Sequence, residues 1–256
     1  MQKSKRLIFM ISAAFILLES ILTSLVQITS GPLGTAVSFA SVASACLFTL
    51  VFFEKKQDSV LLSLALIFTV CADFFLVVLG GNKLLAMIFF SATQICYFLR
   101  LYSRQTKKKL THVLARLGFV SLTLTLTVIV LGDGADALSL VSMFYFANLL
   151  MNIAVAFMQR RRSAAFAIGL LLFSMCDALI GLSVMDNSYL PLPKRSLLKW
   201  LANPPFNLAW LFYVPSQTLI ALSGVDDRLK EGAQEFRDAL NARREKEKAE
   251  EKREGV

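Results

Sequence analysis

The sequence has little of what metalloenzymes and redox proteins are built from. It contains one histidine, His112, and four cysteines in 256 residues. The cysteines are Cys46, Cys71, Cys96 and Cys176; all lie in apolar stretches, without a CxxC pair, so we interpret them as small buried side chains. A metal site or a histidine-based triad has almost nothing to be built from, and we expect no metal and no cofactor.

Long polar stretches are also scarce until the last part of the chain, and 56% of the residues are hydrophobic. This share exceeds that of ordinary soluble domains. Apolar runs of about 20 residues, each long enough to cross a ~30 Å hydrocarbon core as a helix, occur at 7–28, 33–53, 60–79, 84–102, 113–131, 138–158, 164–185 and 205–223. The connections are short. We therefore predict one all-α polytopic integral membrane bundle of eight transmembrane helices over residues 1–224.

The net charge of +9 is unevenly distributed. If the spans alternate, one side of the membrane carries most of the basic residues: those of the N-terminus, Lys55, Lys56, Arg100 to Lys109, Arg160 to Arg162 and those of the tail. The other side carries only Lys83, Lys194, Arg195 and Lys199. The positive-inside rule then places both termini in the cytoplasm. Topology thus explains the basicity, so we expect no nucleic-acid partner, and we expect the chain in a bacterial cytoplasmic membrane.

Three further features concern the organisation of the chain. Spans three and four resemble spans seven and eight, which suggests two parallel four-helix halves. In the longest outer connection, 186–204, we expect Trp200 at the level of the lipid head groups. More than half of residues 225–256 are charged, so we predict a separate cytoplasmic tail that is helical at first and then frays.

Three ionisable residues, Glu19, Asp73 and Asp177, stand out inside the apolar runs. Such groups cost at least ~2.5 to 3.5 kcal/mol each in the membrane, so each needs a reason. Asp73 and Asp177 each lie thirteen residues past the start of their runs, which puts both about 20 Å from the inner edge. No lysine or arginine is expected at that depth, a setting that favours protonated carboxyl groups and suits general acid and base work.

Uncharged polar residues in the spans are candidates for the lining of a pocket around these carboxyl groups. They are Gln94, Tyr97, Asn148, Asn152, Tyr213 and Gln217. The alternative is that such side chains only hydrogen-bond neighbouring helices, and we favour it for Asn148 and Asn152. For Glu19 both interpretations stay open, because its span also holds Ser20, Thr23 and Ser24, which could line a wet crevice.

The motifs "CADFFLVV", "SATQICYFLRLY", "SMCDALIGL" and "YVPSQTLIALS" occur in this order on spans three, four, seven and eight. This combination resembles the YhhN/TMEM86 family of membrane lysoplasmalogenases. The resemblance implies that Asp73 and Asp177 face a cavity in the bundle, and that Tyr213 and Gln217 correspond to the family's Tyr...Gln pair. It also implies hydrolysis of the vinyl ether of a lysophospholipid, giving a fatty aldehyde and a glycerophospho head group.

One position departs from that resemblance. The family typically has a histidine three residues before the tyrosine of span four, whereas this chain has Gln94 before Tyr97. Glutamine forms hydrogen bonds but does not titrate. Two alternatives to an ether hydrolase therefore stay open: a noncatalytic lysolipid-binding protein, favoured by Gln94, and a small transporter or lipid-flipping protein that uses the same aspartates.

Overall fold

A computed structural model describes residues 2–104, 109–159, 164–188, 193 and 196–226. Every regular element in these ranges is helical, which agrees with the all-α class. The elements are α1 (Gln2–Ile28), α2 (Gly31–Val51), α3 (Gln57–Asp73), the π-helix η1 (Phe74–Val78), α4 (Lys83–Arg104), α5 (Lys109–Leu131), the 3₁₀ turn η2 (Gly132–Gly134), α6 (Ala137–Met158), α7 (Ala164–Ser188), α8 (Leu197–Ala202) and α9 (Leu208–Leu222). Most of the predicted tail, 227–256, lies outside the described residues.

Seven of these helices are long and apolar enough to cross a membrane, α3 being counted together with η1. They coincide with the first seven predicted spans. Such a set of apolar helices is that of an integral membrane protein. The eighth predicted span, 205–223, contains the apolar helix α9 of 15 residues, which is about 22 Å long.

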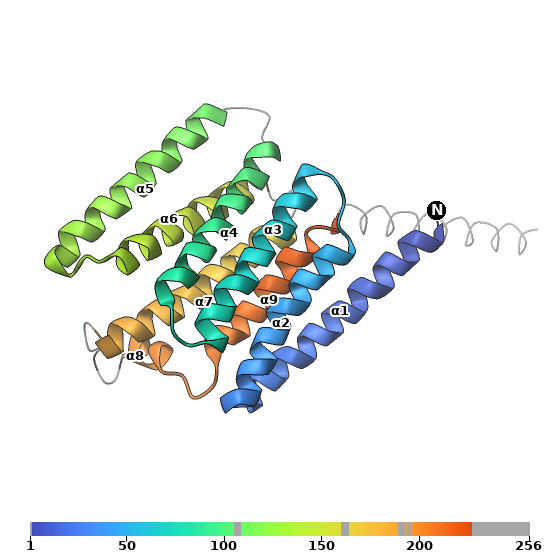
Figure 1. The fold of residues 1–256 in the computed structure, drawn as a ribbon, viewed down its shortest axis with the longest axis horizontal. Helices are drawn as coiled ribbons and strands as arrows, with labels where there is room; N and C mark the ends of the chain where they lie inside the picture. Colours follow the sequence, from blue (N-terminus) through green and yellow to red (C-terminus); the bar gives the residue numbers. More distant parts are fainter. Residues whose placement is uncertain (1, 105–108, 160–163, 189–192, 194–195, 227–256) are drawn as a thin grey trace, which may run out of the picture.

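The helices form one bundle with α5 on one flank and α1 on the other (Figure 1). Between them, α7 packs along α9, α3 along α4, and α4 along α6. The short helix α9 also contacts α1 and α2, so its polar side chains face protein on several sides. Gln217 and Ser216 of α9 are fully buried as a result.

Glycine allows the closest helix contact in the bundle. A Cβ atom on Gly169 of α7 would lie 2.8 Å from Cγ1 of Ile220 and 3.0 Å from the carbonyl oxygen of Ser216. Only a residue without a side chain fits at this distance. In addition, Pro215 inside α9 removes one backbone donor and bends or loosens the helix at that point. Gly169 thus lets the part of α9 from Ser216 to Ile220 pack closely against α7.

The predicted interfacial segment is the short helix α8, which packs against α7. Ser196 caps it by accepting a hydrogen bond from the backbone of Lys199 at 3.1 Å. Lys199 and Asn203 in turn donate to the buried carboxylate of Asp186, at 2.5 and 2.8 Å. The Trp200 side chain is 47% exposed, as a residue at the head-group level would be.

Candidate functional site

The two aspartates singled out in the sequence each accept a hydrogen bond from a tyrosine. Tyr213 of α9 donates its hydroxyl to Oδ2 of Asp73 at 2.5 Å. Tyr145 of α6 donates to Oδ2 of Asp177, also at 2.5 Å. Asp73, the last residue of α3, is buried, and Asp177 of α7 is partly exposed. In both carboxyl groups the tyrosine leaves Oδ1 free of protein donors in the described residues, so Oδ1 is the oxygen that can meet water or substrate.

These four residues form one aspartate cluster. Phe173, one turn before Asp177 on α7, joins the two tyrosines, because its ring centroid lies 6.3 Å from that of Tyr145 and 5.4 Å from that of Tyr213. The cluster thus combines α3, α6, α7 and α9 at a single level of the bundle.

The cluster holds no cation among the residues that the structure describes. The ion pairs found elsewhere in the described part of the chain join Glu54 to Lys56, Asp58 to Arg100 and Asp186 to Lys199. Nor does any group of three or more histidine, cysteine, aspartate or glutamate side chains in that part of the chain have the arrangement of a metal site. The two carboxyl groups themselves can offer proton transfer and negative charge.

A second set of polar residues lies on the cytoplasmic side of the cluster by the predicted topology. Tyr145, Asn148 and Asn152 share one face of α6 at spacings of three and four residues. Asn152 Nδ2 donates to both the backbone oxygen and Oε1 of Gln94, each at 2.9 Å. Asn148 and Asn152 also accept hydrogen bonds from Arg116 of α5, at 2.8 and 2.6 Å. The structure therefore brings Gln94, Asn148 and Asn152 together, with Arg116 as a fourth member.

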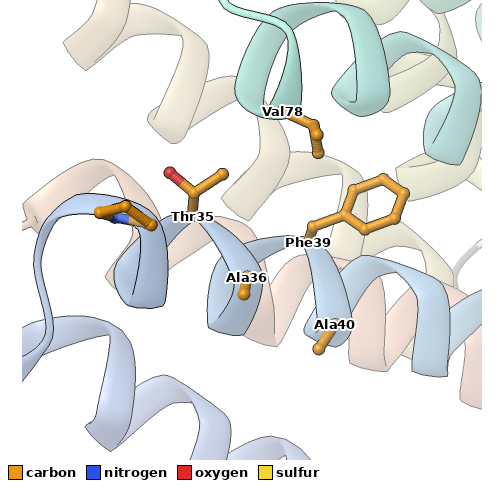
Figure 2. Close-up of a pocket in the computed structure, with 6 residues that line it drawn as sticks. Thr35, Ala36, Phe39, Ala40 and Val78 are labelled. Atoms are coloured by element: carbon orange, nitrogen blue, oxygen red, sulfur yellow. The ribbon is translucent and has the colours of Figure 1, made fainter.

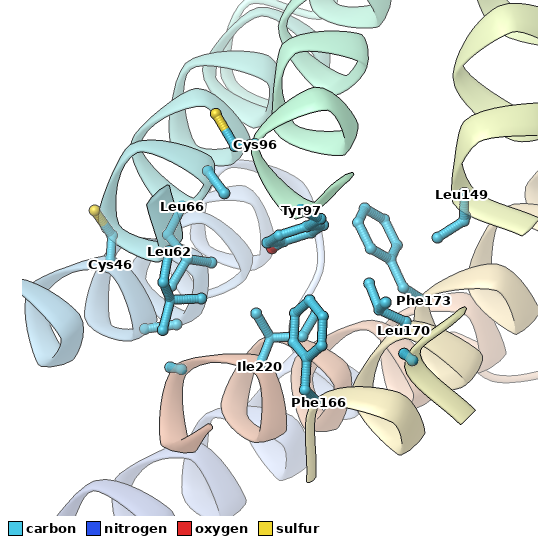
Figure 3. Close-up of a cluster of buried hydrophobic side chains, with 14 of the residues drawn as sticks. Cys46, Leu62, Leu66, Cys96, Tyr97, Leu149, Phe166, Leu170, Phe173 and Ile220 are labelled. Carbon is cyan, nitrogen blue, oxygen red and sulfur yellow. The ribbon is translucent and has the colours of Figure 1, made fainter. Parts of the chain in front are cut away.

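Tyr97 and Gln217 are both fully buried. The Tyr97 ring lies in the middle of the apolar cluster, near Phe166 and Ile220 (Figure 3), with its centroid 5.3 Å from that of Phe166. Gln217 donates to the Ser216 hydroxyl at 3.2 Å. In the described residues, six buried side-chain polar atoms have no hydrogen bond, and three of them belong to the predicted site residues: Gln94 Nε2, Tyr97 Oη and Gln217 Oε1. Because buried polar groups are almost always paired, these atoms mark places for water or a ligand.

Glu19 has different neighbours. It is buried between α1 and α2, where it accepts hydrogen bonds from Ser41, at 2.9 Å, and from Ser44. The serines and threonine next to it on α1 do not line a crevice through their hydroxyls, because Ser20, Thr23 and Ser24 bond to carbonyl oxygens of their own helix. The hydrogen bonds of the Glu19 carboxylate thus join α1 to α2 and include no member of the aspartate cluster.

The count of three ionisable residues in the apolar runs was too low. Arg100, assigned above to a basic cytoplasmic segment, is fully buried on α4. It binds both carboxylate oxygens of Asp58 at 3.0 Å and the Ser223 hydroxyl at 2.8 Å. Arg116 is likewise buried, at 6% exposure. Sequence reasoning missed both, because their positions near span ends are also those of arginines that reach the head groups.

An apolar groove reaches the segment that follows Asp73. It lies between α2 and η1 and encloses about 580 Å³. Its lining residues are Pro32, Thr35, Ala36, Phe39, Ala40 and Val78 (Figure 2). The Phe39 ring lies 6.1 Å from that of Phe74, the residue directly after Asp73. The π-helical turn at this point, a feature often found at functional sites, therefore has the carboxyl group at its start and the groove along its side.

Comparison with known proteins gives one finding. The model of the YhhN family matches residues 35–224, a range that holds most of α2, all of α3 to α9 and all members of the aspartate cluster. Glu19 lies outside the matched range. No curated protein and no solved structure matches the chain with significant similarity.

Proposed function

This chain belongs to the YhhN family, and we propose that it is a lysoplasmalogenase-type ether hydrolase. Its substrate is an alkenyl lysophospholipid, and its products are a fatty aldehyde and a glycerophospho head group. The observation that carries the proposal is the aspartate cluster: two carboxyl groups, each oriented by a tyrosine, whose tyrosines both contact Phe173, with no cation paired to either carboxyl group in the described residues. The reaction class comes from the family resemblance.

The chemistry of a vinyl ether suits this cluster. One aspartate, protonated at Oδ1, donates its proton to the β-carbon of the vinyl ether, which leaves a positive charge shared between the α-carbon and the ether oxygen. The second aspartate, as a carboxylate, stabilises that charge. Water then adds to the α-carbon and gives up a proton to a carboxylate. The resulting hemiacetal collapses as its ether oxygen takes up a proton from the protonated aspartate and its hydroxyl gives up a proton to the other carboxylate, which releases the aldehyde and the glycerol hydroxyl and leaves one aspartate protonated and one ionised, as at the start.

The tyrosines act in this scheme as positioning residues. Each hydroxyl donates to Oδ2 of its aspartate, so Oδ1 is held toward the reacting atoms. Loss of a tyrosine hydroxyl therefore frees the carboxyl group to rotate. Tyr213→Phe and Tyr145→Phe should lower kcat more than they raise KM, because orientation is needed for the chemical step.

The groove beside η1 is suited to the hydrocarbon chain. It is open, apolar and next to Phe74, so a single chain can lie there while the ether linkage meets the carboxyl groups. Ala36→Phe fills part of the groove and should lower kcat/KM for long-chain substrates by about tenfold, since each excluded methylene loses ~0.8 kcal/mol. A short-chain substrate should be spared. Leu47→Phe, at an exposed position of the same helix, is the matched control.

The direct test measures aldehyde release from an alkenyl lysophosphatidylethanolamine by the purified protein in detergent. We expect turnover without any ion gradient, and none with the saturated alkyl ether, which has no double bond to protonate. A transporter would instead need a sealed membrane and would respond to a gradient. Absence of aldehyde over a wide range of pH and head groups would contradict the hydrolase proposal and favour lysolipid binding.

We also propose that α9 is the eighth span and that both termini are cytoplasmic. Helix pairing supports two parallel halves, in which α2, α3 and α4 correspond to α6, α7 and α9. The pair α3 and α4 then matches the pair α7 and α9, and the contact of α4 with α6 matches that of α9 with α2. Single cysteines introduced at Glu54 and Asp133 should be labelled from opposite sides of the membrane. Labelling of both from one side would contradict this topology.

A further inference from the structure

The buried guanidinium of Arg116 has no anionic partner in the part of the chain that the structure describes. Its two terminal nitrogens donate to the side-chain oxygens of Asn148 and Asn152, at 2.8 and 2.6 Å. Its remaining close contact is the Phe98 ring, whose centroid lies 4.3 Å from the guanidinium carbon. Neutral amides and an aromatic ring orient the charge without neutralising it.

Arg100 on α4 shows what this protein does with a buried arginine that only holds helices together. That guanidinium binds both oxygens of Asp58 at 3.0 Å and also the Ser223 hydroxyl. A buried charge without such a counterion is costly. Arg116 is about as buried as Arg100 but lacks this compensation. Proteins bind phosphate and carboxylate groups with a guanidinium that is held in a fixed orientation and is not already paired with an anion.

A second donor is linked to Arg116 through Asn152. Asn152 accepts from Arg116 through Oδ1 and donates to Gln94 Oε1 through Nδ2. The latter bond fixes the amide of Gln94 and leaves its Nε2 as a buried donor without a partner. Asn152 thus holds a cation on one side and an amide donor on the other. Two donors of this kind, joined by one buried residue, make an incomplete site that an anion would complete.

The distance from the aspartate cluster fits a particular anion. On α6, Asn148 follows Tyr145 by three residues and Asn152 follows it by seven, which is about 4.5 and 10.5 Å along the axis. Tyr145 holds Asp177. In a lysophospholipid the three-carbon glycerol backbone separates the ether oxygen from the phosphate ester oxygen. A lipid whose ether linkage is at the carboxyl groups therefore directs its phosphate along α6 toward Arg116.

We propose that Arg116 and Gln94 form a phosphate-binding site, and that its ligand is the phosphodiester of the lysophospholipid substrate. This inference rests on the proposed function for the identity of the ligand. It also gives Gln94 a role: the amide at this position donates a hydrogen bond to the phosphate, so its substitution for histidine changes head-group recognition without removing a catalytic acid.

The test measures equilibrium binding and so does not depend on turnover. The probes are a saturated alkyl lysophosphatidylethanolamine, which cannot be cleaved by this chemistry, and the alkylglycerol with the same chain but no phosphate. Arg116→Gln should weaken binding of the phospholipid by about tenfold or more and leave alkylglycerol binding unchanged. Lys109→Gln, which removes an exposed charge at the start of the same helix, should change neither.

Gln94→Glu is a second variant that does not leave Arg116 without a partner. The new carboxylate lies where we place the phosphate and pairs with the arginine, so the protein should fold at least as stably and lose phospholipid affinity. Equal weakening of both lipids by either folded variant would overturn the proposal and show that Arg116 only supports the structure. Unchanged phospholipid binding would overturn it as well.

Inorganic phosphate distinguishes the two sources of the anion. If the site serves the lipid, inorganic phosphate alone should bind weakly and through Arg116, and should compete with the alkyl lysophospholipid. Tight Arg116-dependent binding of free phosphate, without competition with the lipid, would overturn the assignment of the head group. Failure of the hydrolase proposal has a separate signature, because wild-type protein would then release no aldehyde while Arg116-dependent lipid binding persists.

Discussion

Removing the charge of Asp58 tests whether its ion pair with the buried Arg100 stabilises the protein. Asp58→Asn keeps the size of the side chain but removes the negative charge that Arg100 binds. Arg100 is fully buried, and Asp58 binds it through both oxygens at 3.0 Å. Breaking a buried pair in this way costs about 3–5 kcal/mol, because the remaining charge stays desolvated.

Two features of the structure place the expected loss near the lower limit. The Asp58 side chain is 32% exposed, so water can partly replace its charge. Arg100 also keeps the Ser223 hydroxyl at 2.8 Å and the Phe166 ring, 4.6 Å from its guanidinium carbon. We therefore expect the free energy of unfolding to fall by about 3 kcal/mol, and the thermal midpoint by roughly 6–12 °C for a chain of this size.

The assay is reversible unfolding in mixed micelles, followed by circular dichroism. Glu54→Gln is a matched control, because its carboxylate is 33% exposed and pairs with Lys56 at 2.8 Å, but Lys56 is 78% exposed. Such a surface pair contributes at most about 1 kcal/mol. Adding Arg100→Met to Asp58→Asn should restore part of the loss, since the buried charge is then gone. Equal, small effects of Asp58→Asn and Glu54→Gln would refute the reasoning.

Three further predictions concern packing, a helix cap and the departure from the family pattern. Gly169→Ala should destabilise the protein by about 1–3 kcal/mol, because its Cβ would lie 2.8 Å from a side-chain atom of α9, whereas Gly181→Ala on the same helix meets nothing within 4 Å and should be neutral in thermal unfolding. Asp136 caps the start of α6, and hydrogen bonds from Ser139 hold its pKa below the usual value. The cap therefore stabilises the start of α6 above pH ~4, and this stabilisation is lost as the pH falls. Asp136→Ala should speed amide hydrogen exchange at the start of α6 at neutral pH but have no effect in acid. Gln94→His should not raise aldehyde release, because we assign Gln94 to phosphate binding and not to proton transfer, and a clear gain in release would contradict that assignment.

Much of the architecture could be predicted from the sequence, because hydrocarbon thickness sets a length that apolar runs must reach. The first seven predicted spans coincide with helices. The equal depth of Asp73 and Asp177 also follows from counting residues along two spans of the same direction. Counting cannot say which helices touch, so the tyrosine partner of each aspartate was not assigned in advance.

The residues that sequence reasoning missed share a physical cause. Tyr145 lies on one face of α6 with Asn148 and Asn152, and that spacing could have identified it, but an isolated tyrosine in an apolar run has no charge to explain. Arg100 and Arg116 were hidden by their nearness to span ends, where a long side chain can turn inward or reach the head groups. Tertiary contacts decide between these two outcomes.

The measurement that tests the central claim most directly is aldehyde release from an alkenyl lysophosphatidylethanolamine by purified wild-type protein, Asp73→Asn and Asp177→Asn. Asparagine keeps the size of the side chain but can neither donate the proton nor carry the negative charge. With thermal unfolding showing that the variants are folded, the account predicts turnover in the wild type and a loss of about 10²–10⁴-fold in each variant. Near-wild-type turnover in either folded variant would contradict it.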